Sequence, residues 1–136
     1  MANALYGLAR QAFLDGDIDW SANDIRAVLV DTAAYAVSID VDDFLADIPG
    51  GARIATLAAG FAGKTVTLGV ADANDITFPL VAGATVEAVV IYVHTGADAT
   101  ARLIAYIDTA TGLPVTPNGG DIIVQWDNGA NKIFKL

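Results

Sequence analysis

The chain has 136 residues, a net charge of −9 and no cysteine, and these features exclude several classes of protein. Without cysteine it can have neither a disulfide scaffold nor thiolate chemistry. Its seven Lys and Arg residues are scattered among sixteen acidic residues, so we expect no binding to nucleic acid. No apolar run approaches the ~18 residues of a membrane helix, so we also expect no membrane contact. The length fits a single domain over residues 1–136.

The N-terminal segment carries apolar residues at helical spacing: Leu5, Leu8, Ala9, Ala12 and Phe13. This single stripe predicts an α-helix over residues 2–15, with Asn3 as its N-cap and Gly16 at its end. A helix of about twelve residues is marginal alone. It must therefore dock on the rest of the chain or on a neighbouring subunit.

From residue 18 onward the apolar pattern changes to the two-residue period of β-strands. Such runs occupy residues 25–31, 53–57, 64–68, 76–80, 85–94, 101–108, 121–126 and 132–136. Residues 85–94 are apolar on both faces, so we expect them at the centre of a covered sheet, paired with residues 101–108 as a hairpin. Pro79 restricts its own strand to a sheet edge. The turn sequence at residues 127–129 predicts that the last two strands form a hairpin.

Short strands separated by turn residues are typical of antiparallel sandwiches and barrels. The expected fold is therefore mainly β. It is an antiparallel β-sandwich or barrel of about seven or eight short strands over residues 18–136, with an N-terminal α-helix over residues 2–15. Residues 40–48 are expected to form a single helical turn that Asp40 caps, and residues 109–120 a long loop rich in Gly and Pro.

Asp15, Asp17 and Asp19 alternate in the sequence and resemble the start of a calcium loop. The EF-hand pattern requires Gly at its sixth position and Glu at its twelfth, where this chain has Trp20 and Arg26. We interpret the segment as a solvated turn, with a weak calcium site of another type as the alternative.

No set of residues predicts catalysis. The only histidine, His94, has no serine in a nucleophile motif to act on, and one histidine without cysteine is too few ligands for zinc. Residues 59–65 end in Gly-Lys-Thr, but Ala58 stands where a phosphate-binding loop needs its first glycine. We expect no catalytic residue, no metal and no cofactor, and therefore no enzyme.

Several segments resemble a family of small virion structural proteins encoded by tailed bacteriophages. They are residues 2–19, 25–32, 43–49, 63–71 and 102–136, of which the last is the most specific. The resemblance covers most of the chain and implies a virion component, assembled in the host cytoplasm, with no catalytic residues. Capsid decoration proteins of tailed phages are commonly small β-rich oligomers, and this resemblance implies the same architecture here.

The leading hypothesis is therefore a capsid decoration (cement) protein that binds copies of itself, with a trimer as one option, and the major capsid protein. The expected contact regions are the N-terminal helix and the loop at residues 109–120, because neither is needed to complete a β-sandwich. The candidate interface residues in them are Leu5, Tyr6, Leu8, Phe13, Leu113, Pro114, Val115 and Pro117.

Three alternatives remain open. The protein can be a tail, neck or fibre component of the virion, or a subunit of a self-assembling filament or tube joined head to tail. The third is a small polysaccharide hydrolase or lyase, which would need two carboxylates facing one cleft.

Overall fold

A computed structural model of the chain describes residues 3–110 and 112–136. In chain order, its elements are β1 (Ala4–Leu5), α1 (Gly7–Asp15), β2 (Ile25–Val30), two 3-10 turns (Leu45–Asp47 and Gly50–Ala52), β3 (Arg53–Thr56), β4 (Thr65–Thr67), β5 (Val70–Asp72), β6 (Ile76–Phe78), β7 (Ala88–Val93), β8 (Leu103–Ile107), β9 (Ile122–Val124) and β10 (Phe134–Lys135). The strands pair antiparallel throughout. The predicted class is confirmed: the fold is mainly β and sandwich-like, with one N-terminal helix, although the described residues form ten strands rather than seven or eight.

The largest sheet has the order β1-β8-β7-β2-β3. β7 lies at its centre, between β2 and β8, as its doubly apolar sequence predicts. Almost every residue of these three strands is buried, so both faces of the sheet are covered. The β-branched residues that dominate β2 and β7 suit such a position, because they pack well on a pleated surface.

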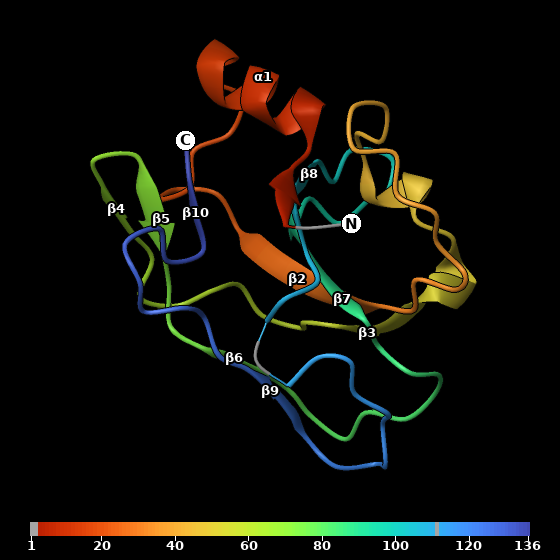
Figure 1. Cartoon of the computed structure of the whole chain (residues 1–136). Coiled ribbons are helices and arrows are strands. Elements are labelled where there is room, and N and C mark those ends of the chain that lie inside the picture. The colour runs from red at the N-terminus through yellow and green to blue at the C-terminus, as the bar shows by residue number, and fades with distance from the viewer. Residues whose placement is uncertain (1–2, 111) are drawn as a thin grey trace.

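Two smaller sheets complete the β-structure: β10-β5-β4, and β6 paired with β9. In Figure 1 they lie to the left of and below the large sheet, while α1 lies above it. Aromatic rings connect these parts, with Trp20 in edge contact with both Phe61 and Phe134 at 5.9 and 5.2 Å between ring centroids. Helix α1 joins this cluster through Phe13, which lies 5.8 Å from Phe134.

The predicted start of the helix is wrong. The helix begins at Gly7 rather than residue 2, and the preceding Ala4 and Leu5 form an edge strand on β8. Asn3 does not cap the helix; its side-chain oxygen accepts the N–H groups of Asp108 and Thr109. Sheet pairing prevails here because a short helix gains little by adding one turn. The other end is confirmed: Gly16 ends the helix with φ +82°.

The predicted C-terminal hairpin is also wrong. β9 pairs with β6, and β10 pairs with β5, so the two last strands belong to different sheets. Trp126 separates them: its indole N–H donates to the Asn74 carbonyl at 3.1 Å, and its backbone N–H donates to the Asp75 carboxylate at 2.9 Å. A buried anchor of this size outweighs the local turn preference.

Residues 40–48 contain the predicted helical turn only at Leu45–Asp47, and the expected cap is wrong. Asp47, not Asp40, binds the backbone, accepting the N–H groups of Asp43 and Phe44 at 2.8 and 2.9 Å. These two hydrogen bonds hold the pKa of the Asp47 carboxyl below its usual value. A general acid needs the opposite shift.

The first prediction concerns the central strand. Ile91 on β7 is fully buried, so Ile91→Ala should lower the free energy of unfolding by about 2–5 kcal/mol through lost burial and a cavity. The matched control is Ile123→Ala on β9, whose side chain is 58% exposed; it should change that free energy by less than about 0.5 kcal/mol. Denaturant unfolding measures both, and equal losses would contradict the assignment of the core.

Candidate protein-binding surface

The acidic turn binds its own backbone. The Asp19 carboxylate accepts the N–H groups of Ser21 and Ala22 at 3.0 and 3.1 Å, and the Asp19 N–H donates to the Asn23 side chain at 2.8 Å. Over residues 3–110 and 112–136, no three His, Cys, Asp or Glu side chains are grouped so that they could hold a metal ion. The hydrogen bonds of Asp19 thus explain why this acidic segment forms a turn.

The other two chemical candidates lie in ordinary structural positions. His94 directly follows β7 and is half-buried, and its backbone N–H donates to the Asp24 carbonyl at 2.8 Å. The segment that ends in Gly-Lys-Thr runs between β3 and β4, strand to strand, without a helix after it. Its Lys64 ammonium donates to the Asn23 carbonyl, so this cation is engaged by the chain itself.

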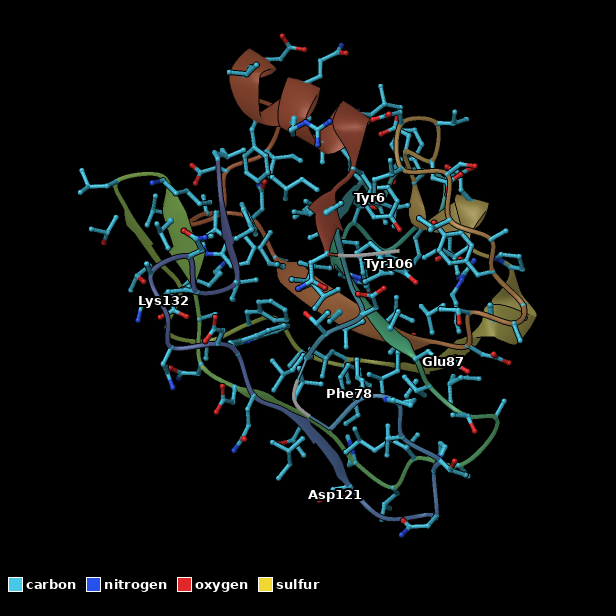
Figure 2. The ribbon with its side chains drawn as sticks, in the orientation of Figure 1. Tyr6, Phe78, Glu87, Tyr106, Asp121 and Lys132 are labelled. Atoms are coloured by element: carbon cyan, nitrogen blue, oxygen red, sulfur yellow. The ribbon has the colours of Figure 1, made fainter. Side chains whose placement is uncertain are left out.

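Buried ionisable groups converge at one place, beneath the N-terminus of α1. The hydroxyl groups of Tyr6 and Tyr35 lie 2.9 Å apart, and the Tyr35 hydroxyl donates to the Asp42 carboxylate at 2.6 Å. The Ser38 N–H donates to the same carboxylate oxygen at 2.9 Å. Both tyrosines are almost completely buried, and Figure 2 shows Tyr6 inside the molecule. The three side chains therefore fasten the N-terminal segment to the loop after β2.

This burial corrects one expected contact residue. Tyr6 has no exposed surface, so a partner cannot reach it while the domain is folded. Leu5, Leu8 and Phe13 are half-buried, and Phe13 already packs against Phe134.

The loop at residues 109–120 is held partly by the chain itself. Val115 pairs with Val86 through two backbone hydrogen bonds of 2.8 and 2.9 Å. Leu113, Val115 and Pro117 are half-buried, and Pro114 is exposed. In Figure 1 residues 112–120 lie at the bottom, far from α1 at the top. The two predicted contact regions meet only at their ends, where the Thr109 N–H donates to the Asn3 side chain at 3.2 Å.

A different surface is hollowed between apolar side chains, and further exposed leucines stand next to its lining residues in sequence. A groove of about 390 Å³ runs between α1 and the β4–β5 hairpin; its apolar lining consists of Phe13, Ile18, Trp20, Val66, Ala71, Phe134 and Leu136. We call it the apolar groove. Leu14 follows Phe13 on the helix with 89% of its side chain exposed, and Leu68 at the hairpin tip is 92% exposed. Large apolar side chains that gather on a surface mark contact sites more reliably than single ones.

Leu68 lowers the stability of the isolated protein for two reasons. It has φ +51° in the two-residue turn between β4 and β5, with Gly69 at φ +79°. Such turns prefer Asn-Gly, because a side chain with a Cβ is strained at positive φ. The leucine also exposes apolar surface to water. Sequence alternation predicted a strand over residues 64–68 that includes Leu68, whereas β4 ends at Thr67 and Leu68 lies in the turn. The Leu-Gly pair is the signal that could have revealed the turn.

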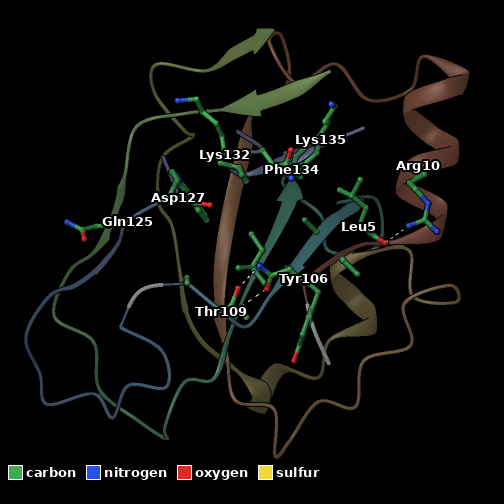
Figure 3. Close-up of a pocket in the computed structure, with 17 residues that line it drawn as sticks. Leu5, Arg10, Tyr106, Thr109, Gln125, Asp127, Lys132, Phe134 and Lys135 are labelled. Carbon is green, nitrogen blue, oxygen red and sulfur yellow. Dashed lines mark hydrogen bonds between the residues drawn. The ribbon is translucent and has the colours of Figure 1, made fainter. Parts of the chain in front are cut away.

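A second and larger cavity adjoins the apolar groove, with which it shares Phe134. It measures about 770 Å³ and runs between strands β1 and β8 and the segment at residues 125–135. We call it the basic groove; Figure 3 shows Arg10, Lys132 and Lys135 along its lining. Its size lies within the range of small-molecule sites.

The charge of the basic groove differs from that of the protein as a whole. Three of the chain's seven cations line it, beside a single acidic residue, Asp127. Two of these cations form ion pairs with long separations: Arg10 lies 3.6 Å from Asp40, and Lys132 lies 3.7 Å from Asp72. In a chain of net charge −9, this groove is suited to an anionic group of a partner.

We predict that Leu68→Asn stabilises the isolated protein. Asn-Gly suits the turn, and the substitution removes exposed apolar surface, so the free energy of unfolding should rise by about 0.5–1 kcal/mol. The matched control is Leu14→Asn, equally exposed but helical, which should destabilise by up to about 0.7 kcal/mol through helix propensity. Denaturant unfolding distinguishes the two, and a destabilised Leu68→Asn variant would contradict the strain at this turn.

A third prediction concerns alkaline pH. Burial raises the pKa of all four tyrosines above the ordinary 10.0, and the adjacent Asp42 raises that of Tyr35 further. As pH rises, the tyrosines of the unfolded chain therefore lose their protons at lower pH than those of the folded protein. The free energy of unfolding that these neutral buried tyrosines support is complete below pH 10.0 and is lost as pH rises above it. Tyrosinate absorbance should appear together with unfolding, and Tyr35→Phe should make the alkaline loss of stability shallower. Full tyrosine ionisation in the folded protein near pH 10 would refute this.

No protein-family model matches the chain, and no curated protein sequence matches it significantly.

Proposed function

We propose that this protein is a non-enzymatic structural subunit that works by binding other proteins, specifically as a capsid decoration protein of a tailed-bacteriophage virion. The observation that carries the proposal is the exposed apolar surface around the apolar groove. Val66 and Leu136, which line the groove, are more than half exposed. Leu14, next to Phe13 in α1, and Leu68, next to Gly69, are almost fully exposed, and Leu68 lies in a strained turn. A soluble monomer gains nothing from this arrangement, whereas a subunit that is covered in an assembly does.

The partners proposed are further copies of this chain and the major capsid protein. Many symmetric copies multiply weak contacts into stable attachment, so small apolar patches are sufficient in a shell. The basic groove complements this surface, because its Arg10 and Lys135 can pair with acidic groups of a neighbouring protein. The resemblance to small phage virion proteins agrees with this role.

Within the virion, a tail, neck or fibre position is the alternative. A filament subunit is the second alternative, and the open strand β4 at the edge of its sheet favours it. The number of copies per particle separates a capsid position from a neck or tail position. Hundreds of copies indicate the capsid shell, and a small number, equal to the subunits of one ring, indicates the neck or tail. Long filaments of purified protein without any capsid would support the filament subunit. Absence of the chain from purified virions would overturn the proposal.

We predict that Leu14→Lys lowers the affinity for capsids at least about tenfold, since burying a lysine in an apolar contact costs more than 1.4 kcal/mol. Deletion of the N-terminal segment is a poorer test, because it would remove the buried Tyr6 and its bond to Tyr35. The matched control is Ile123→Lys on β9, exposed on a different sheet. Binding to capsids that lack the protein measures both variants, and unchanged affinity for Leu14→Lys would remove the helix end from the contact.

A further inference from the structure

Strand β4 is an unprotected sheet edge. In the order β10-β5-β4 it has one neighbour, and Figure 1 shows it outermost on its side of the molecule. Its residues Thr65, Val66 and Thr67 are all exposed. The strand contains no charged residue and no proline, two devices by which proteins commonly block edge-to-edge pairing. Its own shortness is the protection that remains.

The hydrogen-bonding groups of Val66 face outward. β4 and β5 are joined by a two-residue turn, so Thr67 and Val70, which flank the turn, form a hydrogen-bonded pair. In an antiparallel ladder, hydrogen-bonded and non-hydrogen-bonded pairs alternate. The next pair, Val66 with Ala71, is therefore the non-hydrogen-bonded type. The N–H and C=O of Val66 therefore point away from β5, toward the unpaired edge of the sheet.

The side chain of Val66 ends an apolar row. Cross-strand register places Val66 beside Ala71, and Ala71 beside Phe134. All three residues line the apolar groove, so they share the face of the sheet that is directed toward α1. Ala71 is almost completely buried, but Val66 is 54% exposed. The row thus stops at the sheet edge with its last member half-covered.

We propose that β4 pairs antiparallel with β4 of a second copy of this chain, across a two-fold axis at Val66. The sequence Thr-Val-Thr is symmetric about Val66, so this register sets valine opposite valine and each threonine opposite the other threonine of the second copy. Val66 then exchanges both of its outward backbone hydrogen bonds with its counterpart. The apolar row becomes continuous across six strands, and each valine covers the other.

A second copy suits this edge better than an unrelated strand does, because the Thr-Val-Thr sequence is complementary to itself in the antiparallel register. Like charges do not meet at the axis: Lys64 is bonded to the Asn23 carbonyl, and Lys135 lies on β10, two strands away. One pair of three-residue strands buries far less than a standard interface of about 1,600 Å². The isolated dimer should therefore be weak and depend on concentration. The inference rests on the proposed self-association and specifies its surface.

The test uses purified full-length protein without capsids, so that it is independent of the capsid-binding measurement. Sedimentation equilibrium should show the mean mass rising from 14.0 kDa toward twice that value as concentration increases. Val66→Lys and Val66→Glu should each raise the dimer dissociation constant at least about tenfold, because like charges then oppose each other at the axis. An equimolar mixture of the two variants should restore the dimer, because opposite charges now meet.

The control is Ile123→Lys, an exposed isoleucine on another sheet, which should leave the dissociation constant unchanged. Circular dichroism shows whether each variant is folded. The chain has no cysteine, so Val66→Cys gives a second readout. In an antiparallel hydrogen-bonded pair the two Cα atoms lie about 5.5 Å apart, within disulfide reach, so Val66→Cys should cross-link under mild oxidation much faster than Ile123→Cys.

Three results would overturn the inference: a constant monomer mass at all concentrations, a trimer rather than a dimer, or mixed variants that do not reassociate although each is folded. If the wild type binds capsids but stays monomeric in solution, the β4 pairing fails while the proposed function stands. If the β4 dimer forms but the chain is absent from virions, the reverse holds.

Discussion

The antiparallel pairing of β2, β7 and β8 is the constraint on which the rest of the structure depends. Because nearly every side chain on these strands is apolar and buried, both faces of the large sheet must be covered. Helix α1, the loops and two small sheets supply this cover. The small sheets have only three and two strands, so they end early. The half-exposed Val66 at the edge of one of them follows from covering a wide core with short strands.

Local pattern was sufficient for the elements that the core dominates. The run that became β7 could be placed at the centre of a sheet because apolar residues predominate on both of its faces. Gly16 marked the helix end because a left-handed residue is needed there. Pairing between distant segments could not be predicted in the same way. The turn at residues 127–129 favours a hairpin, but Trp126 bonds to Asn74, far away in sequence.

The contact surface was harder to predict than the fold, for a related reason. Tyr6 lies in the segment that the sequence predicts as a docking helix and is indistinguishable by sequence from an interface residue, yet it is buried and its hydroxyl bonds to Tyr35, 29 positions away. Leu68 shows the converse: a strand-like alternation suggests that it is half-buried, whereas the turn exposes it. Whether an apolar side chain faces the core or solvent depends on partners that local periodicity does not contain.

Electrostatics favour the small sheet as a meeting place between copies. Two molecules of charge −9 repel each other, and the repulsion is weakest where the positive charges gather. All three lysines of the chain lie on or beside the three-stranded sheet: Lys64 precedes β4, Lys132 precedes β10, and Lys135 is on β10. Asp72 is the only acidic residue on these strands. Approach through this sheet therefore brings the least negative regions together, so added salt should strengthen association by screening the remaining repulsion.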